Sequence, residues 1–84
     1  MKKIYIVTKL DFLNPDSYPD IDVKVYEKSS KAFLDYSTTI NPYINGPYEV
    51  DTTMSDNYRE TIINLDKDYT TFKIIKFEEQ QIIE

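Results

Sequence analysis

The stretch that decides the fold is residues 58–79, YRETIINLDKDYTTFKIIKFEE. Two runs rich in β-branched and aromatic residues flank the polar segment Asp66-Lys67-Asp68, a pattern typical of a long antiparallel hairpin. Much of the apolar material for a core lies in these runs: Ile62, Ile63, Leu65, Phe72, Ile74, Ile75 and Phe77. In the second run the apolar phase slips by one residue after Ile74, so either both faces are partly covered or a β-bulge re-aims the strand.

Three segments outside this hairpin are also predicted to be strands. Residues 4–10 are apolar on both faces, which indicates a strand near the sheet centre that is covered on both sides. Residues 21–28, IDVKVYEK, alternate strictly and predict a half-buried strand, with Ile21, Val23 and Val25 on one face and Asp22, Lys24 and Tyr26 on the other. Residues 48–54 also alternate, with Tyr48, Val50, Thr52 and Met54 on one face, and a turn at residues 55–57 follows them.

One helix is predicted between these strands. Ala32, Phe33, Tyr36 and Ile40 recur at helical spacing, and Ser29 or Ser30 can cap the start of the helix. We expect the helix to end before Pro42, after about three turns, because the residue preceding a proline is pushed out of the α region. In the following loop, Gly46 is expected to adopt a backbone angle that other residues resist. Residues 78–84 are expected to form a frayed tail or a short turn.

The resulting order is β-β-α-β-β-β. It predicts an α+β domain spanning residues 1–84, with an antiparallel sheet of four to five strands and one short helix packed on one face. The apolar run at the N-terminus is too short for a signal peptide, and no run has the length of a membrane span. We therefore expect a cytoplasmic protein.

The net charge of −5 is unevenly distributed. Residues 1–31 hold six lysines and five acids, a balance of +1, whereas residues 32–84 hold four basic residues and ten acids, a balance of −6. An acidic surface repels nucleic acid and anionic membranes and favours a basic protein partner. Stacking of single-stranded nucleic acid on the tyrosines would need a basic groove beside them, which the total charge disfavours.

Catalytic and metal sites have little support in this sequence. Cysteine and histidine are both absent, which removes thiolate chemistry, the commonest general base and the commonest transition-metal ligand. The pairs Asp20-x-Asp22 and Asp66-x-Asp68 lack the further oxygen ligands of a calcium loop. The single glycine cannot build a phosphate-binding loop. We expect no enzyme, no metal and no cofactor; a small hydrolase is the least supported alternative.

The acidic residues of the C-terminal part are the candidate partner-binding set. Carboxylates two residues apart on a strand lie about 6.5–7 Å apart on one face, where they can take the place of phosphates. Tyrosine is enriched at protein interfaces, so tyrosines in or beside the proline-containing loops are candidate aromatic anchors. The predicted contact residues are Glu49, Asp51, Asp56, Glu60, Asp66, Asp68, Glu78 and Glu79, with Tyr43 and Tyr48 as anchors.

The overall character of the chain resembles the small phage proteins that block host defences, including anti-CRISPR proteins. The resemblance is carried by short length, acidity, absence of Cys and His, and many Ile, Lys, Asn and Tyr. The opening KKIYIVT and the later VKVYEKSSKAF also resemble short phage proteins in which a hairpin leads into a helix, over about the first forty residues. The resemblance implies a non-enzymatic inhibitor in the cytoplasm of a host cell, but it assigns a role to no single residue.

Two functions therefore stay open. In the first, the acidic surface occupies the basic, nucleic-acid-binding site of a larger protein and inhibits it, without itself binding nucleic acid or membrane. In the second, the chain is a structural or assembly module that forms homo-oligomers, such as a homodimer, through its edge strands and the apolar pair Ile82-Ile83.

Overall fold

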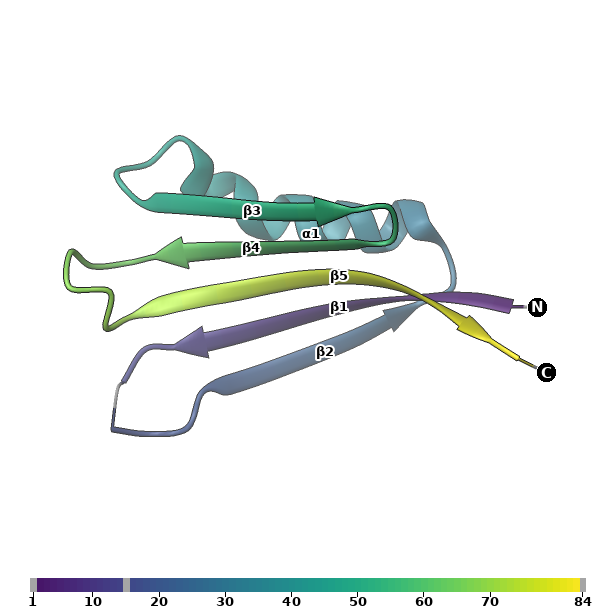
Figure 1. The fold of residues 1–84 in the computed structure, drawn as a ribbon, viewed down its shortest axis with the longest axis horizontal. Coiled ribbons are helices and arrows are strands. Elements are labelled where there is room, and N and C mark those ends of the chain that lie inside the picture. The colour runs from purple at the N-terminus through teal and green to yellow at the C-terminus, as the bar shows by residue number, and fades with distance from the viewer. Residues whose placement is uncertain (1, 15, 84) are drawn as a thin grey trace.

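The computed structural model describes residues 2–14 and 16–83, which form five strands and one helix (Figure 1). Pro15, between the first two predicted strands, and Glu84, at the end of the predicted tail, lie outside the described residues. The elements in chain order are β1 (Lys2–Phe12), β2 (Asp20–Tyr26), α1 (Ser29–Ile44), β3 (Glu49–Ser55), β4 (Tyr58–Asn64) and β5 (Phe72–Ile82).

The strands form one antiparallel sheet in the order β2-β1-β5-β4-β3, so the predicted α+β architecture and its element order are confirmed. The hairpin of β4 and β5 is formed as predicted, and β5 is the central strand. Pairing of β5 with both neighbours runs without interruption, so no bulge causes the phase slip. Ile74 and Ile75 instead face opposite sides of the sheet, because successive strand residues alternate.

The core lies between α1 and one face of the sheet. Tyr36 of α1, Ile63 of β4 and Ile75 of β5 form its buried cluster. The Tyr36 hydroxyl hydrogen-bonds the hydroxyl of buried Thr61, which also contacts the Thr52 hydroxyl at 3.0 Å. This chain of hydroxyl contacts gives the buried polar groups their partners, as a buried hydroxyl requires.

The opposite face of the sheet has no covering layer within the described residues. Figure 1 shows α1 behind the sheet, so the face turned to the viewer is the one the helix leaves open. The prediction of a half-buried strand at residues 21–28 is wrong, because Ile21, Val23 and Val25 lie on this open face of edge strand β2 and are 64%, 54% and 60% exposed. For the same reason, β1 is covered on one side rather than on both.

The ends of α1 differ from the prediction. The residue at the N-cap position is Lys28, with no side-chain cap, so neither Ser29 nor Ser30 caps the helix. The helix also continues past Pro42 to Ile44. Proline near a C-terminus removes one backbone donor, and packing of Tyr43 against the core compensates by holding the last turn in place.

Two further expectations about local structure are corrected. Gly46 does not have a positive φ; its role is steric, because a Cβ there would lie 3.0 Å from the Tyr48 ring. Instead, Tyr69, in the β4–β5 turn, has a φ of 57°. The C-terminal segment is part of a strand rather than a frayed tail, because residues at the start of β1 pair with it, from Lys2 opposite Ile82 onward.

Candidate functional site

Four of the predicted acidic residues lie on the open face of the sheet. Glu49 and Asp51 are two residues apart on β3, Glu60 is on β4, and Glu78 is on β5. Their shared face follows from the register, which sets Asp51 opposite Ile62 and Glu60 opposite Thr53. The helix α1 packs against the intervening strand residues, which point to the other side of the sheet. We call these four residues the acidic face.

The acidic face has no ion-pair partner among the described residues. The four ion pairs among the described residues involve carboxylates outside the acidic face, on Asp11, Glu27, Asp35 and Glu79. Lys76 lies opposite Glu60 in the β4–β5 register without making an ion pair to it. The carboxylates of the acidic face are therefore available to an external cation.

Two tyrosine hydroxyls accompany the acidic face. The Tyr69 hydroxyl donates a hydrogen bond to Glu49 Oε2 at 2.6 Å, and the Tyr58 hydroxyl donates one to Glu60. The hydrogen bond to Glu60 raises the pKa of Tyr58 to about 12, and the bond to Glu49 likewise raises the pKa of Tyr69. Both phenols therefore stay protonated near neutral pH and orient two of the four carboxylates.

An apolar strip lies beside the acidic face on the same side of the sheet. One row crosses all five strands, from Asp51 through Ile62, Ile74 and Leu10 to Ile21. In the adjoining row, the rings of Phe12 and Phe72 stack with centroids 4.5 Å apart. The open face is therefore acidic toward β3 and apolar toward β2. The apolar strip comprises Ile6, Leu10, Phe12, Ile21, Val23, Val25, Ile62, Phe72 and Ile74.

The structure does not gather the other predicted acids with these four. Asp56 lies in the β3–β4 turn, Asp66 and Asp68 lie in the β4–β5 turn, and Glu79 faces the helix side, where it pairs with Lys3 at 3.7 Å. Asp66 has a structural role, because its carboxylate accepts bonds from the Thr70 hydroxyl and backbone N–H. The Thr70 hydroxyl is the largest cause of the lowered pKa of Asp66.

The predicted aromatic anchors also lie off the open face. Tyr43 is partly buried against the core, and its ring meets that of Tyr48 edge-on at 5.3 Å. Tyr48 is exposed and lies directly before β3. Because Glu49 faces the open side, the residue before it is on the helix side of the strand alternation. These two residues therefore form a pair at one end of the molecule, beside the acidic face rather than within it.

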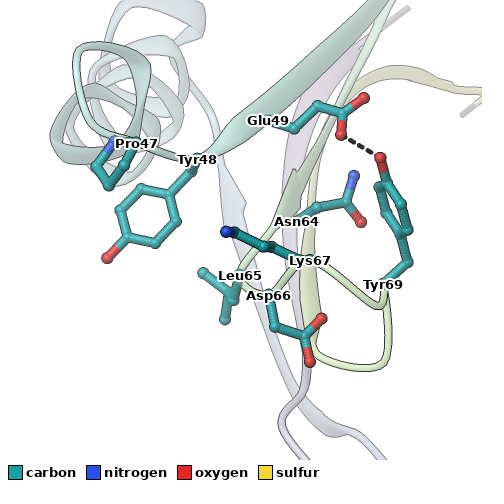
Figure 2. A pocket seen from close by; sticks show the side chains of 8 residues that line it. All are labelled: Pro47, Tyr48, Glu49, Asn64, Leu65, Asp66, Lys67 and Tyr69. Carbon is teal, nitrogen blue, oxygen red and sulfur yellow. Dashed lines mark hydrogen bonds between the residues drawn. The ribbon is translucent and has the colours of Figure 1, made fainter.

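A hollow of about 360 Å³ lies where this end of the sheet meets the β4–β5 turn (Figure 2). Glu49, Asp66 and Tyr48 of the predicted set line it, together with Lys67 and Tyr69. Figure 2 shows the Tyr69 ring standing over the turn with its hydroxyl directed at Glu49. The hollow extends the acidic face around the end of β3.

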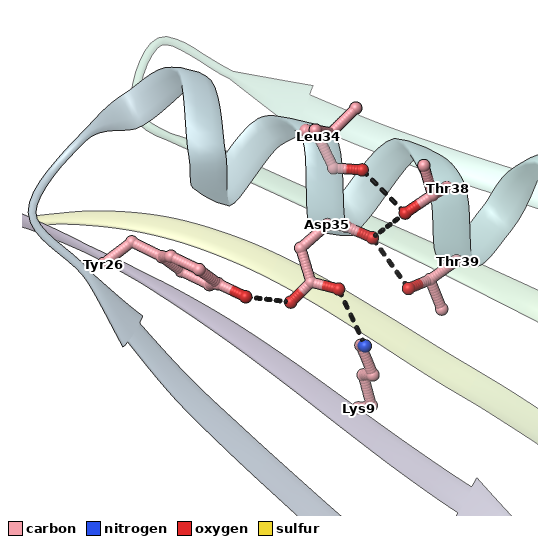
Figure 3. A network of polar contacts seen from close by, with 6 residues as sticks. All are labelled: Lys9, Tyr26, Leu34, Asp35, Thr38 and Thr39. Carbon is pink, nitrogen blue, oxygen red and sulfur yellow. Dashed lines mark hydrogen bonds and ion pairs between the residues drawn. The ribbon is translucent and has the colours of Figure 1, made fainter.

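The helix side has paired charges and provides a contrast with the open face (Figure 3). Asp35 of α1 accepts a hydrogen bond from Lys9 Nζ at 2.9 Å and one from the Tyr26 hydroxyl at 2.6 Å. Burial tends to raise the pKa of Asp35, but these two donors outweigh it and hold that pKa below the ordinary 3.8. Through Asp35, α1 is joined to both β1 and β2.

This network gives a pH-dependent prediction. Because the pKa of Asp35 is lower in the folded than in the unfolded chain, its stabilisation is present above about pH 4 and is lost as the pH falls through the folded value. We expect Asp35→Asn to lower the free energy of unfolding by about 1–3 kcal/mol at pH 7. The difference from wild type should shrink as thermal melts are taken from pH 7 to about pH 2, because the carboxylate becomes protonated as the pH falls through its folded pKa. An equal difference at both pH values would contradict this role for the carboxylate.

Sequence reasoning missed Tyr69, Tyr58 and the apolar strip as parts of this surface. The sequence did indicate part of the strip, because Ile21, Val23 and Val25 are two residues apart along a strand and therefore share one face. Their exposure could not be read from the sequence, since alternation indicates a shared face but not whether a second layer covers it. No sequence pattern predicted that the loop residue Tyr69 would reach Glu49.

Comparison with known proteins adds no functional assignment: no family model matches the chain, and no curated protein or solved structure matches it either. Within residues 2–14 and 16–83, no group of three or more acidic side chains is arranged to hold a metal ion. The helix of the described chain lacks the length and hydropathy needed to cross a bilayer.

Proposed function

We propose that this chain is a non-enzymatic binding protein that occupies a basic surface of a larger protein through the open face of its sheet. The observation that carries the proposal is the acidic face itself: four carboxylates on one side of the sheet, without lysine or arginine partners among the described residues. Acids retained only for solubility have no need to share a face, and Lys76, the lysine opposite Glu60 on this face, makes no ion pair to any of the four.

The apolar strip supports the same proposal. Contiguous exposed apolar surface on a soluble domain marks an interaction site. Five strands about 4.8 Å apart and roughly 25–35 Å long give a face on the order of 600 Å². A standard protein interface buries about 800 Å² per partner, so the open face has nearly the required size. Its partner would combine basic residues with an apolar border.

The mechanism is electrostatic steering followed by apolar contact. Carboxylates on Glu49, Asp51, Glu60 and Glu78 attract a basic groove, and complementary potentials of this kind raise association rates. Once the faces meet, the strip excludes water and slows dissociation. A basic groove of this type is suited to nucleic acid, so occupation by this chain would inhibit a nucleic-acid-processing protein, as an anti-CRISPR protein does.

The proposal is tested by affinity capture from a lysate of the cells in which the protein acts. Tagged wild-type chain should retain a basic protein at about 50 mM salt and release most of it at about 500 mM, because screening at the higher concentration shortens the Debye length to a few ångströms. Retained protein should be displaced by duplex or single-stranded nucleic acid. The proposal would be contradicted if retention did not depend on salt, or if the retained protein were acidic.

A further inference from the structure

The outer edge of β2 is open along its whole length. Every residue from Asp20 to Val25 is exposed, and β2 ends the sheet, with β1 as its only neighbour among the described strands. Natural edge strands are normally protected by proline, by a bulge, by a covering loop or by charged side chains. The charged residues of β2 are of both signs, Asp20, Asp22 and Lys24, so they can pair with opposite charges on a second strand. Residues 20–26 contain no proline, and the pairing with β1 is uninterrupted from Tyr5–Tyr26 to Asp11–Asp20. The edge is therefore regular enough to pair with another strand.

The side chains of β2 complement a second copy of the same strand. In a two-fold antiparallel pair, residues that lie opposite each other point to the same side of the sheet. The symmetric registers that align at least five residues of each β2 strand are therefore centred on Asp22, Val23 or Lys24. Centring on Asp22 or on Lys24 places two like charges directly opposite, which is destabilising. The Asp22 register also sets Asp20 opposite Lys24, but it aligns only five residues of each β2 strand, whereas the Val23 register aligns all seven. Centring on Val23 sets Asp22 opposite Lys24 twice, and opposite charges in this position are stabilising.

The same register satisfies the other face of the strand. On the open side of the sheet, Val23 meets Val23 of the second copy, and Ile21 meets Val25, so β-branched residues pair across the new contact. The seven residues of β2 would add roughly six to eight backbone hydrogen bonds across the two-fold axis. Charge, apolar contact and backbone pairing thus select one register.

The other edge strand does not offer this complementarity. β3 carries Glu49 and Asp51 and no basic residue, so any self-pairing of β3 accumulates negative charge. Pairing of β2 with β3 of another copy would leave free edges and grow without limit, which a closed two-fold contact avoids.

We infer that two copies of this chain associate edge to edge through β2, in antiparallel register about Val23, to form a continuous ten-stranded sheet. Because the two-fold axis is perpendicular to the sheet, both open faces lie on the same side. Outer strands roughly 43 Å apart would carry the two acidic faces, which would make the protein a bivalent binder. That last consequence rests on the proposed function, whereas the dimer itself does not.

The first test is the mass of the purified chain in solution. Light scattering at rising concentration should show twice the monomer mass of 10.0 kDa. Concentrations up to about 1 mM are needed because a short edge contact binds weakly. A chain that remains monomeric throughout this range, or species that grow beyond a dimer, would overturn the inference.

The second test is a charge swap at the two positions that face each other. Asp22→Lys places lysine opposite lysine, and Lys24→Asp places aspartate opposite aspartate, so each should raise the dimer dissociation constant by about tenfold or more. The double variant restores opposite charges and should recover the wild-type constant. Both residues are exposed, so circular dichroism should show a native fold in all three variants. Failure of the double variant to recover dimerisation would contradict this register.

The third test uses the absence of cysteine from the chain. Val23 faces its own copy, at a Cα separation of about 4.5–5.5 Å that suits a disulfide, so Val23→Cys should give a covalent dimer on mild oxidation. Ile21→Cys is the matched control, because it lies on the same face and edge but roughly 14 Å from its copy. Equal cross-linking of both variants, or of neither, would reject pairing about Val23. These measurements involve no partner protein, so their failure would leave the proposed function standing.

Discussion

Replacing Ile75 with alanine is expected to lower the thermal unfolding midpoint by roughly 10 °C or more. Ile75 is 1% exposed and packs in the cluster with Tyr36 and Ile63, between the central strand and the helix. Truncation of a buried isoleucine to alanine costs about 2–5 kcal/mol, because transfer free energy is lost and a cavity remains. Small domains have a total stability near the lower end of about 5–15 kcal/mol, so a large part of the population should unfold at physiological temperature.

The neighbouring residue provides a matched control. Ile74 has the same side chain on the same strand, but it faces the open side and is only partly buried. We expect Ile74→Ala to cost about half as much as Ile75→Ala, because less area leaves water at that position when the chain folds. Both variants are compared by thermal melts monitored by circular dichroism. Equal losses in the two variants would show that the sheet has a core on both sides and would contradict the one-sided architecture.

Local pattern predicted the strands well, because each is marked by β-branched residues between polar turns. The hairpin of residues 58–79 is formed as predicted. Of the predicted helix stripe, Ala32, Tyr36 and Ile40 face the core, whereas Phe33 is 41% exposed. The end of α1 was not predictable from Pro42 alone. The proline rule concerns the backbone, whereas the last turn is held by tertiary packing of Tyr43.

The number of layers was beyond the reach of the sequence. The alternation of Ile21, Val23 and Val25 was correctly read as a shared face, but that face is open. A buried strand face and a strand face that binds a partner are both apolar, because the first is removed from water on folding and the second on binding. Exposed alternation of this kind is therefore an indication of an interface that only the structure reveals.

Strand parity also decides which part of the predicted contact set can act together. Glu49 and Asp51 are two residues apart and necessarily share a face, whereas Glu78 and Glu79 are adjacent and necessarily do not. This division was available from the sequence once residues 78 and 79 were recognised as part of a strand. The assumption of a frayed tail concealed it, because pairing with the start of β1 is a long-range contact.

Reversal of three charges on the acidic face is expected to weaken partner binding by at least about 100-fold. The variant Glu49→Lys/Asp51→Lys/Glu78→Lys replaces attraction to a basic surface by repulsion at three positions of one face. It leaves Glu60 and its hydrogen bond from Tyr58 in place. Glu49 and Asp51 are exposed, Glu78 is half-buried, and none of the three makes an ion pair among the described residues. The one contact described above that is lost is the exposed hydrogen bond from Tyr69 to Glu49, so the fold should be retained, as far-ultraviolet circular dichroism would show.

The control changes the same amount of charge elsewhere. Asp16→Lys/Asp56→Lys/Asp68→Lys alters three exposed acids that lie in turns off the open face and make no ion pair among the described residues. Each substitution adds two positive charges, so both variants carry +1 in place of −5 and differ only in where the charge lies. General changes in solubility or in long-range attraction affect the two variants alike.

The most direct measurement is the amount of partner captured from the same lysate by wild type and by these two variants at low salt. If the open face binds the partner, the acidic-face variant should retain almost none, and the control should retain close to the wild-type amount. Equal losses in both variants would show that only total charge matters, and full retention by the acidic-face variant would show that the partner binds elsewhere; either result would contradict a working role for this face of the sheet.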